Sequence, residues 1–275
     1  MSYEDFVKPG YEPRSDELIA LFYIEPAEGI SMKRAAGGVA AESSIGTWTV
    51  SVMLSDRIME LGAKVYRVEG NWVWISYPPD LFEPGSMPQI WSSICGNIFG
   101  MKAANGIRLE DVYWPPDIVK SFPGPLGGIN GIRERLKIYK RPVLATVPKP
   151  KVGMTTEEHV KVAYQVWLGG VDLVKDDENL TNQSFNRFEE RVREVLRMRD
   201  KVEKETGERK SALLNITAPY KEMERRAKLV ADYGGEFVMI DILTAGWAAV
   251  QSIRELCEDL GLMIHAHRAF HAAFT

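Results

Sequence analysis

At residues 169–179 the chain reads GGVDLVKDDEN, in which a short apolar run is followed directly by one lysine and three carboxylates. The run Val171–Val174 predicts a buried strand. Four more apolar runs resemble it, at Val143–Val147, Ala212–Ile216, Phe237–Ile242 and Leu262–Ala266. Amphipathic helices are predicted between the runs, at Glu157–Leu168, Asn186–Thr206, Lys221–Tyr233 and Trp247–Leu260. Repeated strand and helix units of this kind predict a parallel sheet.

Polar residues follow each predicted strand at the point where it ends: Lys149 and Lys151, then Lys175, Asp177 and Glu178, then Asn215, Asp241, His265 and His267. Active sites of (β/α)₈ barrels are built at the C-terminal ends of several strands, so the pattern favours a barrel. A doubly wound sheet is the competing architecture. It lacks support because no glycine-rich phosphate loop follows the first strand.

A closed barrel needs eight strands, and this sequence supplies about five. We therefore expect an incomplete (β/α)₈ barrel with about five of the eight βα units. An open sheet leaves edges unpaired, so the chain is expected to be a C-terminally truncated piece of a longer protein.

The part of the chain before these units has a different, α+β pattern. Strands are predicted at Leu18–Ile24, Ala63–Val68 and Asn71–Tyr77, among helix-like stretches. Proline and glycine are dense over residues 114–128, which favours an interdomain linker. The prediction is an N-terminal α+β domain of ferredoxin-like type over residues 1–124 and a barrel domain over residues 125–275.

Composition is that of an ordinary globular protein, with 45% hydrophobic and 26% charged residues and a net charge of -4. Nucleic-acid binding is not expected, because it relies on dense lysine and arginine. No stretch stays apolar for the ~18 residues that a membrane span requires, so a cytoplasmic protein is expected. The two cysteines, Cys95 and Cys257, lack zinc-ligand spacing and are predicted to be buried thiols.

The acidic cluster after residue 174 suits a hard cation such as Mg²⁺, which prefers oxygen ligands. Taken alone, a Lys-Asp-Asp-Glu sequence is more often a solvated acidic loop. Lys149 and Lys151 change this balance, since they place further cations beside the carboxylates. Positive charge nearby lowers the pKa of a lysine, and a neutral amine can react with CO₂ to form an anionic carbamate.

Several motifs together resemble the large subunit of ribulose bisphosphate carboxylase, and they span essentially the whole chain. In the predicted barrel they are KPK (149–151), GGVDLVKDDEN (169–179) and HAHRAFH (265–271). In the first domain and the linker they are AESSIGTWT (41–49), GNIFG (96–100), RLED (108–111) and FPGP (122–125). The segment Thr146–Lys149 and the short N-terminus resemble the archaeal form III enzymes.

The resemblance implies a carbon-carbon lyase that carboxylates ribulose 1,5-bisphosphate to two 3-phosphoglycerate, with O₂ as a competing substrate. It implies that Lys175 carries CO₂ as a carbamate and binds Mg²⁺ together with Asp177 and Glu178. The implied catalytic residues are Lys149, Lys175 and His267, and the implied substrate-binding residues are Glu42, Thr47, Trp48, Asn97, Lys151 and Arg268. Part of this set completes a partner's site in the family, so a homodimer or a higher oligomer is expected.

Two departures from the family pattern matter. The threonine expected two positions before Lys149 is Val147, with Thr146 one place earlier. The C-terminal region that supplies a mobile-loop lysine and phosphate-binding groups in the family is absent, so the chain alone is expected to be inactive. Alternatives are an enolase of another sugar phosphate and a non-catalytic subunit. Nucleoside monophosphate salvage and carbon fixation both remain open as pathways.

Overall fold

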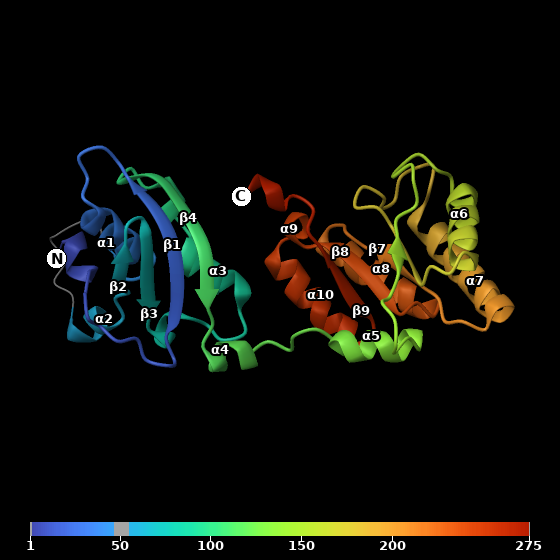
Figure 1. The fold of residues 1–275 in the computed structure, drawn as a ribbon, viewed down its shortest axis with the longest axis horizontal. Coiled ribbons are helices and arrows are strands. Elements are labelled where there is room, and N and C mark those ends of the chain that lie inside the picture. Colours follow the sequence, from blue (N-terminus) through green and yellow to red (C-terminus); the bar gives the residue numbers. More distant parts are fainter. Residues whose placement is uncertain (1, 47–54, 275) are drawn as a thin grey trace. The chain divides into compact units, whose positions relative to one another are not determined.

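The computed structural model describes residues 2–46 and 55–274, and the chain divides into two compact units. The first unit comprises Met1–Pro123 and the second comprises Gly124–Thr275. Each unit is a sheet with helices packed on it (Figure 1) and contains its own apolar core.

The first unit is built on a four-stranded antiparallel sheet with the order β2-β3-β1-β4. Its main elements are β1 (Leu18–Pro26), α1 (Met32–Glu42), β2 (Lys64–Glu69), β3 (Trp72–Tyr77), α3 (Met87–Cys95) and β4 (Ala104–Tyr113). This βαββαβ succession confirms the predicted ferredoxin-like α+β fold. Shorter elements are α2 (Asp56–Glu60), α4 (Pro116–Lys120) and 3₁₀ turns at Tyr3–Phe6, Pro79–Leu81 and Ile98–Gly100.

The core of the first unit lies between its sheet and helices α1 and α3. Every second residue of β1, from Leu18 to Ile24, is buried against these helices. Helix α1 also packs closely on the N-terminal 3₁₀ turn, since a Cβ atom added at Gly37 would lie 2.0 Å from the carbonyl oxygen of Tyr3. The absence of a side chain at Gly37 is therefore required for this contact.

The second unit is a parallel sheet with the order β5-β6-β7-β8-β9, and each pair of neighbouring strands is parallel. Its strands are β5 (Ala145–Thr146), β6 (Leu173–Lys175), β7 (Ser211–Asn215), β8 (Phe237–Asp241) and β9 (Met263–His267). Its helices are α5 (Gly128–Leu136), α6 (Thr156–Leu168), α7 (Phe188–Thr206), α8 (Tyr220–Asp232), α9 (Ile242–Ala245) and α10 (Trp247–Asp259), followed by a 3₁₀ turn at His271–Ala273. Sequential parallel strands joined by helices confirm the prediction of a partial (β/α) barrel.

Alternation along the strands separates two faces of this sheet. The outer face packs on the connecting helices and includes Val174, Ala212, Leu214, Val238 and Ile240. The inner face includes Leu173, Leu213, Phe237, Met239 and Met263, which pack together with Leu136 at the end of α5. Successive side chains of a strand point to opposite faces, so residues at spacings of two share a face.

Helix α7 is the longest of the second unit, with 19 residues, and Gly207, whose φ is 72°, caps its C-terminal end. Its buried face is apolar apart from two arginines, Arg191 and Arg199.

Across residues 2–46 and 55–274, no helix is both long enough and apolar enough to cross a lipid bilayer.

Candidate active site

Four neighbouring strands of the second unit end in a polar residue: β6 in Lys175, β7 in Asn215, β8 in Asp241 and β9 in His267. Each lies an even number of positions after a residue of the inner apolar cluster. The four side chains are therefore on the inner face, at the C-terminal edge of the sheet. This is the edge at which barrel enzymes assemble their active sites.

Lys175 is half-buried and donates a hydrogen bond from Nζ to the carbonyl oxygen of Asp176 at 2.7 Å. Burial lowers the pKa of the Lys175 amine, while the nearby carboxylates of Glu178 and Asp177 oppose the shift. The net lowering enlarges the fraction of neutral amine, which is the form that acts as a nucleophile.

Asp177 is buried, and its Oδ2 accepts a hydrogen bond from Nζ of Lys149 at 2.9 Å. Burial by itself would raise the pKa of Asp177, but hydrogen bonds from Lys149 and Asn179 outweigh it and hold the pKa at about 2. The side-chain amide of Asn179 donates to Asp177 at 3.1 Å and to Glu178 at 3.3 Å. One amide thus brings the two carboxylates together.

The main chain beneath these carboxylates is held by Asn215, which is fully buried. Its Nδ2 donates to the carbonyl oxygens of Asp177 at 3.3 Å and of Glu178 at 3.2 Å. The end of β7 therefore fixes the loop that follows β6. The sequence showed Asn215 as a polar residue at a strand end, but gave no sign of its part in holding this loop.

The donor set at the end of β6 suits a hard divalent cation. Asp177 and Glu178 offer carboxylate oxygens, and Lys175 offers an amine that becomes a further oxygen donor if it is carbamylated. Among the described residues, no three His, Cys, Asp or Glu side chains form a ready metal cluster. The unmodified set thus offers two carboxylate side chains, and a carbamate on Lys175 would add a third oxygen donor.

His267 lies between two carboxylates. Its Nδ1 is 2.9 Å from Oδ1 of Asp241, and its Nε2 is 4.0 Å from Oε2 of Glu178. The same Nδ1 lies 3.2 Å from the backbone nitrogen of Ala269, so it accepts from that N–H when unprotonated and donates to Asp241 when protonated. Burial raises the pKa of Asp241, against the attraction of His267. The sequence showed Asp241 only as a polar residue at a strand end, and did not indicate its contact with His267.

Of the remaining predicted residues of this unit, Lys151 and Arg268 are exposed and His265 is partly buried. Lys151 lies in the loop between β5 and α6, with its side chain exposed. Arg268 is also exposed and contacts Nδ1 of His271 at 3.2 Å. His265 lies on β9 beside His267, with ring centroids 6.3 Å apart, and burial lowers its pKa.

Two predicted residues of the first unit come together there. The side-chain amide of Asn97 donates to Oε1 of Glu42 at 3.4 Å, and both residues line a cleft of about 520 Å³. Lys102 lines the same cleft. The other two predictions for this unit, Thr47 and Trp48, lie outside the described residues.

Comparison with known proteins gives the same assignment along the whole chain. The model of the ribulose bisphosphate carboxylase large chain N-terminal domain matches residues 5–118, and the model of its catalytic domain matches residues 128–275. The ribulose bisphosphate carboxylase of Pyrococcus abyssi is 54% identical over 277 residues, covering 99% of this chain and 65% of that protein.

Solved archaeal structures are similar over the same extent. A sulfate complex of the octameric enzyme from Pyrococcus horikoshii has a TM-score of 0.96 and 53% identity, covering 100% of this chain and 66% of that one. A dimeric archaeal Rubisco from Hyperthermus butylicus has a TM-score of 0.95 and 58% identity, covering 99% and 65%. The chain spans less than two thirds of the length of these relatives. Since one family model covers the first unit and the other covers the second, the chain belongs to the ribulose bisphosphate carboxylase large chain family.

Proposed function

We propose that the chain carries the metal-site and proton-transfer residues of a Mg²⁺-dependent ribulose bisphosphate carboxylase. One observation supports this most: adjacent parallel strands end in Lys175, Asn215, Asp241 and His267, with Asp177 and Glu178 beside the lysine. The reaction joins CO₂ and water to ribulose 1,5-bisphosphate and gives two molecules of 3-phosphoglycerate, and O₂ competes with CO₂.

Lys175 is proposed to bind the activating CO₂. Its neutral Nζ attacks the carbon of CO₂ and releases one proton to solvent, which leaves an anionic carbamate on the side chain. The carbamate would join Asp177 and Glu178 as an oxygen ligand. When bound, Mg²⁺ supplies positive charge that stabilises an enediolate form of the substrate.

Lys149 and His267 are proposed to handle protons around the reacting carbons. The Nζ of Lys149 reaches the Asp177 carboxylate, and the Nε2 of His267 faces Glu178, so both basic groups border the metal-site residues. Arg268 and Lys151 are exposed at the same edge of the sheet, where a planar guanidinium and an amine suit phosphate oxygens.

The first unit is proposed to form a separate domain, over residues 1–124, that serves the active site of a second copy. The support is the joint position of Glu42 and Asn97 in one cleft, together with the dimeric and octameric states of the similar archaeal enzymes. Thr47 and Trp48 are proposed to belong to the same substrate-binding region. A homodimer is the smallest assembly in which such sites are complete.

The test is CO₂ fixation by the protein expressed from its complete reading frame. Radiolabelled CO₂ incorporated into acid-stable 3-phosphoglycerate is measured with ribulose 1,5-bisphosphate and Mg²⁺, with and without EDTA. Lys175→Ala should abolish incorporation, whereas Lys161→Ala, a matched exposed lysine on α6, should leave it unchanged. Fixation that survives Lys175→Ala, or enolisation of the sugar phosphate without fixation, would reject the proposal.

A further inference from the structure

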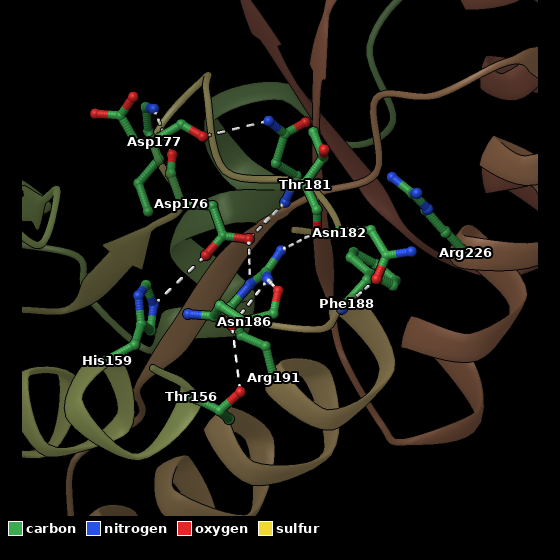
Figure 2. Close-up of polar contacts among 12 residues, drawn as sticks. Thr156, His159, Asp176, Asp177, Thr181, Asn182, Asn186, Phe188, Arg191 and Arg226 are labelled. Carbon is green, nitrogen blue, oxygen red and sulfur yellow. Dashed lines mark hydrogen bonds and ion pairs between the residues drawn. The ribbon is translucent and has the colours of Figure 1, made fainter. Parts of the chain in front are cut away.

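The carboxylate of Asp176, which stands between Lys175 and Asp177 of the proposed metal site, points away from that site. Asp176 follows Lys175 and precedes Asp177, and strand alternation turns its side chain toward the outer face of the sheet. Figure 2 shows Asp176 directed at Arg191 and His159, which belong to helices α7 and α6. The side chain of Asp176 is 2% exposed.

The side chain of Asp176 contacts three neighbouring elements: α7, β7 and α6. Its Oδ2 accepts from Nε of Arg191 at 3.1 Å and from the backbone nitrogen of Asn215 at 3.0 Å. Its Oδ1 lies 3.5 Å from Nε2 of His159. Its own backbone N–H donates to the carbonyl oxygen of Leu213 at 3.0 Å. The residue at the centre of the metal-site sequence is therefore held by both its side chain and its main chain.

Arg191 is fully buried. Its guanidinium holds the loop between β6 and α7, which begins with the acidic residues. Beyond Asp176, its guanidinium donates to the carbonyl oxygen of Thr181 at 2.8 Å and to the carbonyl and side-chain oxygens of Asn186, both at 3.1 Å. Asn186 in turn donates to the carbonyl oxygen of Met154, just before α6. Loop 176–187 is thus wrapped around one guanidinium (Figure 2).

We infer that Asp176 and Arg191 are positioning residues that set the backbone at residues 175–178, so that Lys175, Asp177 and Glu178 converge on one side. This inference rests on the proposed function of those three residues. A buried ion pair adds little net stability, because removing both charges from water costs about as much free energy as their attraction returns. The ion pair between Asp176 and Arg191 instead fixes the two peptide units that flank Asp176. A small rotation of either peptide unit would redirect the side chains of Lys175 and Asp177. Groups that orient metal ligands from behind commonly change metal affinity by ~10- to 100-fold when they are removed.

The same strand offers a matched control. Asp172 precedes β6, is 1% exposed, and pairs with Nη1 and Nη2 of Arg141, each at 2.7 Å. It also accepts from a backbone N–H, that of Leu144, at 2.8 Å. Asp172 and Asp176 are therefore both buried and both bonded to an arginine and to a backbone N–H, although Arg141 is 44% exposed and Arg191 is fully buried. They lie on either side of the strand, one before it and one after it.

The experiment compares the unaltered protein with Asp176→Asn, Arg191→Met, the double variant and Asp172→Asn. Mg²⁺ affinity at saturating CO₂ is measured by calorimetry, the Lys175 carbamate by ¹³C NMR with ¹³CO₂, and the Tm without metal. Asp176→Asn should weaken Mg²⁺ binding by ~10- to 100-fold and reduce the carbamate signal. Asp172→Asn should lower the Tm and change the Mg²⁺ affinity by less than about twofold, because it lies far along the strand from the ligands.

The double variant separates positioning from stability. Removing both charges should recover the Tm relative to Arg191→Met, because no unpaired buried charge remains, while Mg²⁺ affinity stays at least ~10-fold weaker than in the unaltered protein. If a single variant does not fold, the Mg²⁺ affinity of the double variant still tests the inference. Affinity that recovers with the Tm, or that is equal in Asp176→Asn and the unaltered protein, would overturn the inference and leave the proposed function standing. An unaltered protein without CO₂-dependent Mg²⁺ binding at Lys175 would overturn both.

Discussion

The amine of Lys149 lies 2.9 Å from an oxygen of the Asp177 carboxylate, and the two residues differ sharply in exposure: the lysine side chain is 64% exposed and the aspartate side chain 3%. The pair thus joins an exposed cation to a buried anion. Asn179 also donates to this carboxylate, from its backbone N–H at 3.2 Å and its side-chain amide at 3.1 Å, so the lysine is not its only partner. In this arrangement the lysine holds an oxygen that a bound cation would use.

Substituting Lys149→Met should therefore tighten Mg²⁺ binding while abolishing turnover. Removing the positive charge that pairs with the Asp177 carboxylate should raise the Mg²⁺ affinity by at least roughly tenfold, because a unit charge about 4 Å from a divalent cation costs about 2 kcal/mol even at the dielectric constant of water. Calorimetric titration of Mg²⁺ at saturating CO₂ measures the change, with Lys161→Met as the control for loss of an exposed lysine. Weaker binding in Lys149→Met would show that the lysine supports the site instead of competing for it.

Carbamate formation at Lys175 should rise with pH at constant dissolved CO₂. Burial lowers the pKa of this amine, so its neutral fraction should reach one half below the ~10.4 of an ordinary lysine. The ¹³C carbamate signal, recorded across pH 7 to 10 against Lys175→Arg as a blank, checks this. A signal that does not depend on pH would exclude the lysine amine as the reacting group.

The pair formed by Asp172 and Arg141 should make stability depend on acid pH. Burial alone would raise the pKa of Asp172, but the hydrogen bonds from Arg141 and Leu144 outweigh it, and the folded pKa lies below its ordinary value. A depressed folded pKa gives stability that is fully present above the unfolded pKa of ~3.9 and is lost as the pH falls through the folded pKa. Asp172→Asn should therefore lower the free energy of unfolding by about 1–3 kcal/mol at pH 7.

This difference in stability between Asp172→Asn and the unaltered protein should persist at pH 5. It should shrink as the pH falls below the unfolded pKa of ~3.9, where Asp172 is protonated first in the unfolded chain, and vanish below the lower folded pKa. Urea unfolding at each pH gives the comparison. Asp232→Asn, at an exposed aspartate on α8, should stay within about 0.5 kcal/mol of the unaltered protein throughout. A constant deficit of Asp172→Asn down to pH 3 would contradict the expected linkage.

Gly37→Ala should destabilise the first unit. The added Cβ would lie 2.0 Å from the carbonyl oxygen of Tyr3, which is backbone and can yield only if α1 moves. A loss of about 1–3 kcal/mol or more in the free energy of unfolding is expected from such overpacking. Gly100→Ala is the control, because its Cβ would meet no atom within 4 Å. Equal Tm values for the two variants would contradict the close packing of α1 on Tyr3.

Periodicity predicted most of the second unit. Strands β7, β8 and β9 and helices α6, α7, α8 and α10 begin and end within two residues of the predicted positions, because continuous apolar runs and amphipathic helices are strong local signals. Strand β5 forms a ladder only at Ala145–Thr146, shorter than its apolar run. Helix α5 was not predicted, because its glycines at 128 and 131 resemble a continuation of the linker.

The secondary structure of the first unit was predicted less completely. Strand β4 was not predicted, because it lies at an edge of the sheet and has no fully buried position along its length. Helix α4 lies within the proline-rich segment that favoured an irregular linker. Cys257 is a buried thiol as predicted, whereas Cys95 is only half-buried.

The candidate site was predicted residue by residue, but its supports were not. Side chains that follow a strand can be found from sequence, and this pattern placed Lys149, Lys175 and His267 at strand ends, whereas their catalytic roles were taken from the family resemblance. Arg191 lies in the middle of a strongly charged helix, and only its position on the apolar face, three residues after Phe188, sets it apart. Its partner 15 residues away cannot be identified without the fold.

The alternation at the end of β6 also constrains how this segment can change over evolution. Asp176 and Asp177 are the same amino acid with opposite orientations, one facing the helices and one facing the inner edge. Deleting a single residue upstream within the strand would exchange their roles and carry Lys175 into the apolar helix layer, although the local composition would hardly alter. The number of residues in this segment should therefore be constrained as strongly as their identity.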